Sequence, residues 1–394
     1  MAPITPILAA CGAASGPEAG CSVVLRASVV GRDELQTALT EAPDGATICV
    51  SGTFDIRTDR VGASGKRGLT LRGVDEGTGA TFDFHDVVGP NGLKFSAMTD
   101  FTLEDLTVRN VVGDAIEVRG SERVVLRRLR VEWTGGGDPN TRNYGLYPVE
   151  SHDVLVEGCE TSSSQEAGIY AGQSTNVVIR GNRSFANLMG VQLENTRDAE
   201  VVGNELFDNT VGVAVMDVPL LPAGNGGGAL VADNLVRANN RGTTAKDRVN
   251  ASYPHGVGVL VIAHDRVEIR DNLIAGNVSA GVAILSFRTV DQVLPSSRRD
   301  ARFDPDPTGV FVHGNRLSDN GARPDPLFQR LGLPRRSDIT WDGLSQPGVG
   351  PHGGLCVRRN HGAVLATPGG VLAGPDAVRH ECTLPALAPV GGAG

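Results

Sequence analysis

The sequence nearly repeats itself between residues 177 and 209. The segment VVIRGNRSFAN (177–187) is followed by AEVVGNELFDN (199–209), which starts 22 positions later, and MGVQLENTRD (189–198) lies between them. The same pattern can be followed along most of the chain. Because self-similarity at a fixed period decides the architecture before any single motif does, we expect an array of stacked repeats.

Composition sets the outer limits of this array. The chain has 394 residues, of which 40% are hydrophobic, so there is enough apolar material for a large core. Stacked repeats share one continuous core, which favours a single domain over the two or three that length alone suggests. The net charge of −9 argues against a nucleic-acid partner, which needs a basic surface. No apolar run approaches the ~18 residues of a membrane span.

Each repeat contains a strand that begins with a small residue and alternates between inward and outward positions. These first strands are GLKFSA (92–97), AIEVRG (115–120), GLYPVE (145–150), GIYAGQ (168–173), GVQLEN (190–195), GVAVMD (212–217), GVLVIA (258–263) and GVAILS (281–286). A second and a shorter third strand follow each of them. Three strands of period 2 in ~22 residues leave no room for helices. The sequence therefore predicts an all-β parallel β-helix of about ten coils, a rod of ~45–50 Å at the usual strand spacing.

Both ends of the array differ from its middle. Residues 1–31 read as a leader and tether, and RDELQTALTEA (32–42) predicts a short α-helix that caps the first coil. We place the solenoid at 32–366 and a tail at 367–394, which we expect to be disordered unless Cys382 anchors it. Residues 321–354 read as a long wrapping loop. The segments 355–360 and 363–366 are predicted to pair as a last strand pair over the open end.

The cysteines bear on the compartment. Leu8-Ala9-Ala10-Cys11 resembles the lipobox of bacterial lipoproteins, although a chance match in an Ala-rich segment is the alternative. We expect export to the periplasm, the cell surface or the medium, with any membrane contact through a lipid on Cys11. In an oxidising compartment, Cys21–Cys49 and Cys356–Cys382 would close the two ends, but spacing leaves other pairings open. No Cys/His spacing indicates a zinc site.

Alignment of the coils produces columns of identical or alternating residues. After the second strand lie five asparagines, which we interpret as an internal amide ladder: Asn182, Asn204, Asn234, Asn272 and Asn315. A catalytic or metal role is the alternative. A further asparagine column at the next corner (187, 209, 239, 277, 320) indicates left-handed or Asx-turn residues. Outward on the second strand the charge alternates along Arg72, Glu104, Arg127, Glu157 and Arg180, which indicates a structural face and not a polyanion site.

These features resemble the right-handed parallel β-helix proteins of the pectin-lyase-like superfamily. The segments YGLYPV (144–149), GIYAGQS (168–174), GVQLEN (190–195) and VMDVP (215–219) are similar to a bacterial exported family within it. The resemblance covers residues 32–320 and implies a right-handed coil. The superfamily implies polysaccharide lyases, hydrolases and C5-epimerases. The chain lacks the paired-Asp and GHG pattern of polygalacturonases and the DPHE-type string of mannuronan epimerases, so the reaction class stays open.

The outward face of the first strands is the predicted site. Two of the four tyrosines, Tyr147 and Tyr170, lie on it, and Tyr144 and Tyr253 come just before such strands. Insertions at 78–91, 134–143, 218–227, 241–255 and 287–309 flank this strand, and insertions often mark a binding face. Tyrosines on a walled polar face suit stacking against sugar rings. The alternative is that a half-buried strand is simply a favourable place for Tyr.

We expect an acidic, uronate-containing polysaccharide to be bound or modified here by a monomeric protein. Lyase or epimerase chemistry needs a carboxylate neutraliser, a base and an acid. Arg119 is the candidate neutraliser, Glu194 or Tyr170 the base, and Tyr147 or His255 the acid. The predicted substrate contacts are Glu117, Tyr144, Glu150, Gln173, Gln192, Asn195, Asp217 and Tyr253.

Other readings of the same residues remain open at this stage. A hydrolase would use two of Glu117, Glu150, Glu194 and Asp217. We expect no cofactor, although Glu150, Glu194, Asn195 and Asp217 also form a candidate Ca²⁺ set, because Ca²⁺ prefers oxygen ligands. The rivals to an enzyme are a non-catalytic polysaccharide-binding module and an accessory protein of a metal or redox system.

Overall fold

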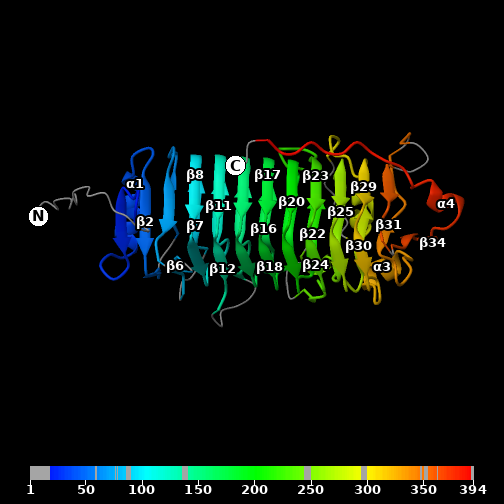
Figure 1. Cartoon of the computed structure of the whole chain (residues 1–394), viewed down its shortest axis with the longest axis horizontal. Coiled ribbons are helices and arrows are strands. Elements are labelled where there is room, and N and C mark those ends of the chain that lie inside the picture. Colours follow the sequence, from blue (N-terminus) through cyan, green and yellow to red (C-terminus); the bar gives the residue numbers. More distant parts are fainter. Residues whose placement is uncertain are drawn as a thin grey trace, which may run out of the picture.

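The chain folds into a rod of stacked coils (Figure 1). The computed structural model describes residues 18–391, with the exception of 58–59, 76, 78, 86–89, 135–140, 244–249, 294–299, 347, 350–353 and 362. Most of the predicted leader, with Cys11, therefore lies outside the described residues. None of the described helices is long and apolar enough to cross a membrane.

Three sheets run along the rod, and the chain enters each of them once per coil. The first sheet contains β4 (Val61–Ser64), β7 (Leu93–Ser96), β10 (Ile116–Arg119), β13 (Leu146–Val149), β16 (Ala167–Gly172), β19 (Met189–Glu194), β22 (Val211–Met216), β25 (Val257–Ile262), β28 (Ala280–Leu285), β31 (Ile339–Trp341), β33 (Leu365–Thr367) and β34 (Gly370–Val371). All of its pairings are parallel except the last, β33 with β34.

The second and third sheets consist of parallel strands. The second contains β1 (Val23–Arg26), β2 (Thr47–Ser51), β5 (Thr70–Gly73), β8 (Thr99–Glu104), β11 (Glu122–Arg127), β14 (His152–Glu157), β17 (Thr175–Arg180), β20 (Arg197–Val202), β23 (Gly227–Ala232), β26 (Val267–Arg270), β29 (Val310–His313) and β32 (Leu355–Arg358). The third contains β3 (Thr53–Asp55), β6 (Ala80–Asp83), β9 (Leu106–Arg109), β12 (Arg130–Glu132), β15 (Glu160–Ser162), β18 (Arg183–Phe185), β21 (Glu205–Phe207), β24 (Leu235–Arg237), β27 (Leu273–Ala275) and β30 (Arg316–Ser318). The predicted parallel β-helix is confirmed, with about 12 turns instead of ten.

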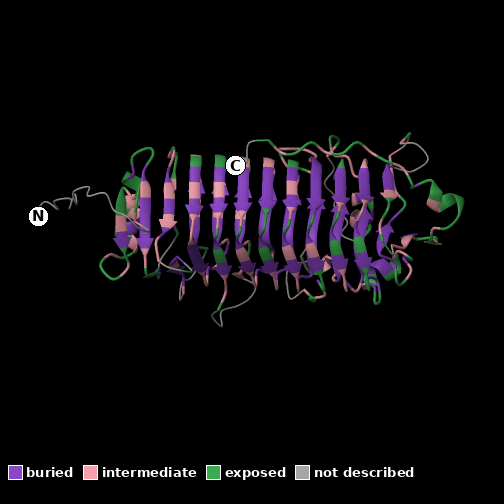
Figure 2. Cartoon of the chain, viewed as in Figure 1, coloured by how far each residue is buried: buried purple, intermediate pink, exposed green. Residues whose placement is uncertain are grey.

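Inward side chains of successive coils stack in register to form the core. On the first sheet the row of partners is Ile116, Leu146, Ile169, Val191 and Val213, each with no exposed surface. Buried residues fill the strands, and exposed residues gather in loops and at strand ends (Figure 2). Burial of one such aliphatic side chain contributes roughly 1.5–3 kcal/mol. A core of this kind is long and continuous, so the solenoid is one domain in its described part.

The predicted asparagine ladder is present and is longer than expected. Asn204 donates from its backbone N–H and from Nδ2 to Oδ1 of Asn234, both at 2.9 Å, and the same two bonds recur at Asn182, Asn234, Asn272 and Asn315. The second asparagine column forms another ladder of this kind, so the prediction of left-handed backbone there was wrong. The left-handed residue is the one before it, such as Asp208 with φ 52°.

The alternating charges pair across the second sheet as predicted. Arg127 lies between Glu104 and Glu157 in the strand register, and its Nε donates to Glu157 Oε2 at 3.0 Å. Arg180 donates to the other oxygen of Glu157 at 2.7 Å. The hydrogen bond from Arg180 lowers the pKa of Glu157 most, and the bond from Arg127 adds to it. Glu157 is therefore neutralised by both neighbouring coils.

Helix α1 (Arg32–Glu41) caps the first coil, which confirms the prediction. Leu35 and Leu39 face the core and have no exposed surface. The amide of Gln36 bonds to both the N–H and the C=O of Gly62, at 3.0 and 2.9 Å, so it takes the place of a neighbouring strand at the edge of the first sheet. The edge is thereby covered, as an open coil stack requires.

The two predicted disulfides are confirmed. Cys21–Cys49 joins the segment before α1 to β2, and Cys356–Cys382 joins β32 to the tail. The solenoid begins earlier than predicted, because β1 lies inside the expected tether and pairs with β2. The tail lies against the outside of the second sheet, where the N–H of Leu387 donates to Glu268 and the N–H of Val390 to Glu200. It runs back along the rod as the red trace in Figure 1.

The C-terminal coils differ from the prediction in two respects. The expected wrapping loop contains α3 (Pro326–Arg330) and the strand β31, which continues the first sheet. The two segments expected to pair with each other instead extend different sheets, since β32 pairs with β29 and β33 pairs with β31. The sequence pattern fades there because the inserted helix α3 separates β30 from β31, while α4 (Pro375–Val378) follows the last strand.

Candidate functional site

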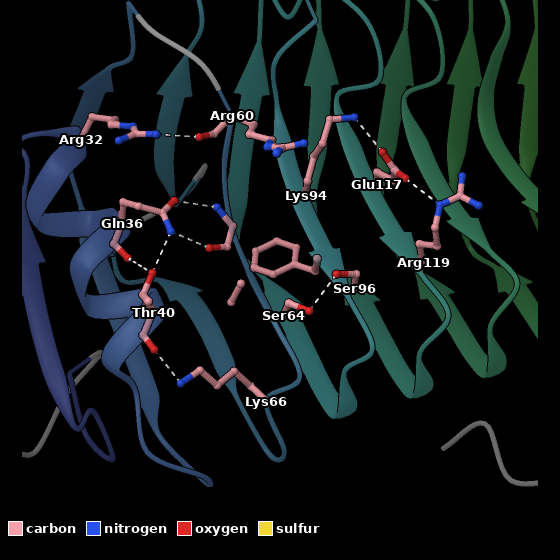
Figure 3. A pocket seen from close by; sticks show the side chains of 13 residues that line it. Arg32, Gln36, Thr40, Arg60, Ser64, Lys66, Lys94, Ser96, Glu117 and Arg119 are labelled. Carbon is pink, nitrogen blue, oxygen red and sulfur yellow. Dashed lines mark hydrogen bonds and ion pairs between the residues drawn. The ribbon is translucent and has the colours of Figure 1, made fainter.

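A groove of about 700 Å³ lies on the outward face of the first sheet, at its N-terminal end (Figure 3). Its floor comes from β4, β7 and β10, and one wall is α1. The lining residues are Arg32, Gln36, Thr40, Arg60, Gly62, Ala63, Ser64, Lys66, Lys94, Phe95, Ser96, Glu117 and Arg119. Five of these residues carry a positive charge, and Glu117 is the acidic one among them. We call this site the basic groove.

The helix wall is fixed by hydrogen bonds between α1 and β4. Arg32, Gln36 and Thr40 are spaced four residues apart, so they share one face of α1, and that face lines the groove. Arg32 donates to the carbonyl of Arg60 at 3.0 Å. Lys66 donates to the carbonyls of Thr40 and Ala42 at the end of the helix, which places a cation where the helix dipole favours it.

On the floor, Glu117 is held between two cations. Lys94 Nζ donates to Glu117 Oε2 at 2.7 Å, and Arg119 Nε donates to Glu117 Oε1 at 3.0 Å. Burial raises the pKa of Glu117, but the bonds from Lys94 and Arg119 outweigh it and leave the pKa lowered. Arg119 also donates to Glu150 at 2.9 Å, and these acidic partners keep its pKa raised despite burial. Arg119 is therefore charged at any physiological pH.

Two titratable groups lie beside this cluster. Asp114 Oδ2 is 3.8 Å from Lys94 Nζ, and burial raises its pKa even though Lys94 opposes the shift. Tyr147 on β13 is the next outward residue after Glu117 in the strand register. Burial raises the pKa of Tyr147, and the nearby Arg119 partly offsets this. Tyr147 is thus a neutral phenol that faces a guanidinium.

Three tyrosines lie next to the groove on the side away from α1, beginning with Tyr147 beside Glu117 in the strand register. The rings of Tyr144 and Tyr147 stack with centroids 4.6 Å apart, and both contact the ring of Tyr170 at 4.7 and 4.9 Å. Offset and tilted contacts of this kind stabilise by about 0.5–1.5 kcal/mol beyond burial. Tyr144 and Tyr147 are half-buried, and Tyr170 is only 4% exposed.

Tyr170 and Glu194, which were predicted to take a proton from the substrate, bond to each other and do not line the basic groove. Tyr170 Oη donates to Glu194 Oε1 at 2.9 Å, and Gln192 Nε2 donates to Glu194 Oε2 at 3.0 Å. Burial raises the pKa of Glu194, although these two bonds lower it in part, and burial raises the pKa of Tyr170 strongly. Gln192 is itself only 4% exposed. The three side chains form an internal network, because the sheet is covered above them.

The predicted substrate contacts at the ends of the first strands also differ in their exposure. Glu150 is exposed and reaches Arg119, and Gln173 is half-buried with a φ of 50°. Asn195 is buried and bonds to the backbone of Val218 and Gly224. Asp217 has no exposed surface. The predictions of Asn195 and Asp217 as substrate contacts are therefore corrected, since both are used inside the protein.

Asp217 belongs to a buried pair with a histidine. His264 Nδ1 lies 2.8 Å from Asp217 Oδ1, and the other carboxylate oxygen accepts from Asn225 and the N–H of Gly226. The Ca²⁺ hypothesis needs Asp217 to gather with Glu150, Glu194 and Asn195, but each of these binds different neighbours. Among the described residues no three acidic, His or Cys side chains are grouped as a metal site requires.

His255 and Tyr253 lie far from the groove. His255 Nδ1 is 2.6 Å from Asp325 Oδ2. His255 comes just before β25, and Asp325 comes just before α3. β25 is four strands beyond β13 on the first sheet, which corresponds to roughly 19 Å at the usual strand spacing. Tyr253 Oη contacts the sulfur of Met216 in an apolar cluster. The structure therefore does not bring His255 together with Arg119 and Tyr147.

Among the residues that the structure describes, the outward face of the first sheet is open at β4 to β13 and covered from β16 to β28. Outward residues of the covered part form a second apolar core, with Met189, Ala214, Leu260 and Ala283 at 1% exposure or less. Side chains from the inserted segments pack on it, among them Tyr253, Phe287, Phe303, Leu327 and Phe328. The described residues of the insertions at 241–255 and 287–309 thus cover the sheet, and with Val218 they leave an apolar pocket of about 200 Å³ in place of the open cleft that was predicted.

Sequence reasoning missed three charged residues that line the groove, Arg32, Arg60 and Lys66, and also Asp114, which lies beside Lys94. The capping helix that contains Arg32 was predicted from its apolar face, which carries Leu35, Leu39 and, less regularly, Ala38 and Ala42. The spacing of Arg32, Gln36 and Thr40 was a usable signal for a polar helix face beside the first sheet. Lys66 and Asp114 lie outside the repeated strings, so no period marked them.

Comparison with known proteins identifies a family that has the same fold. The protein family described as "Right handed beta helix region" matches residues 91–293, which is more than half of the chain. The chain belongs to the right-handed β-helix family. The matched region of this β-helix protein starts just before β7 and ends with α2 (Phe287–Val293). No curated protein matches the chain.

Solved structures resemble this β-helix protein at low sequence identity. The mannuronan C-5 epimerase AlgE4 A-module of Azotobacter vinelandii has a TM-score of 0.56 and 16% identity, with 92% of this chain and 86% of that chain covered. The AlgE6 A-module of the same organism has a TM-score of 0.56 and 15% identity, with coverage of 90% and 86%. A tailspike protein of E. coli bacteriophage HK620, in complex with a pentasaccharide, has a TM-score of 0.54 and 11% identity, with coverage of 86% and 61%. At these identities the likeness concerns the fold.

Proposed function

We propose that this β-helix protein binds an acidic, uronate-containing polysaccharide in the basic groove and acts on it by proton transfer. The observation that carries the proposal is the charge of the groove. Five cationic side chains surround one carboxylate in a concave site, on a chain whose net charge is −9. A concave site lined by one sign of charge focuses the field and raises the local concentration of oppositely charged ligand.

The residue types favour carboxylates as the bound anion. The guanidinium groups of Arg32, Arg60 and Arg119 offer planar pairs of donors that match a carboxylate. Tyr147 adds a partly exposed aromatic face with a polar tip, which suits a sugar ring. The similar structures support a saccharide ligand, because two carry the name mannuronan C-5 epimerase and the third holds a pentasaccharide.

The chemistry we propose uses three groups at the open end of the floor. Lyase and epimerase reactions remove the proton next to a uronate carboxylate, so that carboxylate must be neutralised. Arg119 neutralises it. Asp114, with its raised pKa, accepts the proton, and Tyr147, kept neutral by its raised pKa, donates one to the leaving oxygen or to the opposite face of the sugar. This assignment replaces Glu194, Tyr170 and His255 with Asp114 and Tyr147, which lie beside the groove next to Lys94 and Glu117.

An exported location fits this substrate, since such polysaccharides lie outside the cytoplasm. Two disulfides, at the two ends of the solenoid, are what an oxidising compartment permits. We propose the periplasm, the cell surface or the medium, and we retain a lipid on Cys11 as the means of attachment.

The test combines binding and turnover on a panel of polymannuronate, polyguluronate and polygalacturonate. Absorbance from unsaturated ends detects a lyase, and NMR of the recovered polymer detects an epimerase. Tyr147→Phe should reduce turnover by about a hundredfold or more while binding stays within a few-fold, because a general acid contributes roughly 10²–10⁴-fold. Binding without either product would support the rival, a non-catalytic binding module.

The charge requirement has a matched control on another face. Arg119→Gln should weaken binding at least tenfold, because a charge-assisted hydrogen bond contributes about 1.5–3 kcal/mol. Arg180→Gln removes the same charge from the second sheet, where Arg180 is paired with Glu157, and should leave binding unchanged. Equal effects of the two substitutions would mean that net charge, and not the groove, attracts the polymer.

A further inference from the structure

We propose that the basic groove receives the end of an acidic saccharide chain and not its interior. The inference rests on the proposed function and specifies its substrate. It follows from the two boundaries of the groove along the rod, one formed by α1 and the other by the tyrosine cluster of Tyr144, Tyr147 and Tyr170.

The first boundary is a rigid wall. The face of α1 that carries Arg32, Gln36 and Thr40 lines the groove. Two hydrogen bonds from Gln36 to Gly62 tie this face to the edge strand β4, and the buried Leu35 and Leu39 fix the helix on the core. Figure 3 shows the helix standing at one end of the row of strands that forms the floor. A saccharide that runs along the rod cannot continue past α1.

The second boundary is the point where the sheet becomes covered. Tyr147 is half-buried and its ring contacts Tyr144 and Tyr170, while Tyr170 is 4% exposed. Beyond them the outward residues of β19, β22, β25 and β28 lie in the second apolar core. A chain lying on the sheet must therefore rise off it on this side, so the rest of the polymer leaves the groove here and only α1 closes the other side.

The open floor between these boundaries is short. It extends over β4, β7, β10 and β13, which are three strand spacings, or about 15 Å. The cationic groups follow the same direction, since Arg32, Arg60, Lys94 and Arg119 succeed one another from α1 across the strands in Figure 3. An anionic chain that pairs with this row lies along the rod, so its terminal residues must end inside the groove.

The stoichiometry of binding distinguishes chain ends from chain interiors. Oligomannuronates of two to six residues and polymannuronate fractions of increasing length serve as probes, and the number of protein molecules bound per saccharide chain is measured by sedimentation. End binding predicts at most two molecules per chain at every length, and a dissociation constant per chain end that stays within about threefold from the tetramer to the polymer.

A matched pair of variants tests whether the bound chain end lies beside α1. Arg32→Gln, at the α1 end, should weaken binding of the tetramer and the polymer by the same factor, about tenfold for one charge-assisted bond. Arg180→Gln, on the second sheet, should change neither. A number of bound molecules that rises in proportion to chain length would overturn end binding but leave the proposed function standing. Binding of no acidic saccharide from the mannuronate, guluronate and galacturonate series would reject both.

Discussion

Each asparagine of the first ladder makes its side-chain hydrogen bonds inside the solenoid. Asn204 accepts from Asn182, donates to Asn234 and also donates from Nδ2 to the carbonyl of Ile179 at 3.0 Å. It is 2% exposed, so water cannot replace these bonds. A buried polar group that loses its partner costs about 1–3 kcal/mol, which is why one missing amide affects two neighbouring coils.

Asn204→Ala should therefore lower the free energy of unfolding by about 3 kcal/mol, because it leaves several buried groups without partners. Urea unfolding followed by circular dichroism measures the change. Asn360→Ala is the matched comparison, since Asn360 ends the same ladder and is half-exposed, so water can take over its bonds. A loss at Asn360 as large as that at Asn204 would contradict the importance of burial.

The half-buried carboxyl of Glu194 gives the stability a defined pH dependence. Burial raises its pKa above the ordinary value of 4.5, against the opposing bonds from Tyr170 and Gln192. A raised pKa stabilises the fold below the ordinary value, and this contribution is lost as the pH rises through the folded-state pKa. Glu194→Gln does not titrate, so its stability relative to the unmodified protein should increase as the pH rises from 4.

Glu205 provides a control of opposite sign. The hydrogen bond from Arg237, assisted by Arg183, lowers the pKa of Glu205. Glu205→Gln should therefore lose stability relative to the unmodified protein as the pH rises through the same interval. Melting temperatures from pH 4 to 8 measure both variants. Parallel slopes for Glu194→Gln and Glu205→Gln would show that the two carboxyls do not titrate as the structure indicates.

At the scale of elements, the cap on the first coil depends on one side chain. Gln36 satisfies the N–H and the C=O that Gly62 presents at the sheet edge. Gln36→Ala should destabilise the protein by about 1–3 kcal/mol and increase hydrogen exchange in β4, because both edge groups lose their partner. Thr37→Ala, on the exposed side of α1, is the control and should change neither. Unchanged exchange in β4 would mean that the helix is held by Leu35 and Leu39 alone.

The strands were predictable from the sequence because their chemistry repeats. Inward valines and leucines, asparagine corners and alternating charges recur once per coil, so the period alone placed β7 to β30 in their sheets. The site was less predictable, because it depends on what covers the sheet. Tyr147 and Tyr170 occupy the same outward row, yet only Tyr147 borders the groove, since the segments that bury Tyr170 and Gln192 follow no period. Arg60, Lys66 and Asp114 come from connections whose path the repeat does not specify.

Considered as a whole, the molecule separates stability from function along its length. The middle coils are held by their neighbours on both sides, as in other repeat proteins, and the end coils have one neighbour each. The basic groove lies at the N-terminal end, directly beside the capping helix. The devices that secure this end, α1 and the Cys21–Cys49 disulfide, therefore also preserve the geometry of the groove.

The two disulfides should accordingly act locally, each on its own end. They join residues 28 and 26 positions apart, and closing loops of this length stabilises by about 3.5 kcal/mol each in the chain-entropy estimate. Replacing Cys21 and Cys49 by serine should raise hydrogen exchange in β1, β2 and β5 and weaken saccharide binding, with the coils from β14 to β23 unaffected. Replacing Cys356 and Cys382 should raise exchange in β29 and β32 and leave binding unchanged, because the groove lies at the other end. Reductant added to the variant with all four substitutions should have no further effect. Equal loss of protection along the whole rod would show that the solenoid unfolds as one cooperative unit, and the link between the N-terminal disulfide and the groove would then be lost.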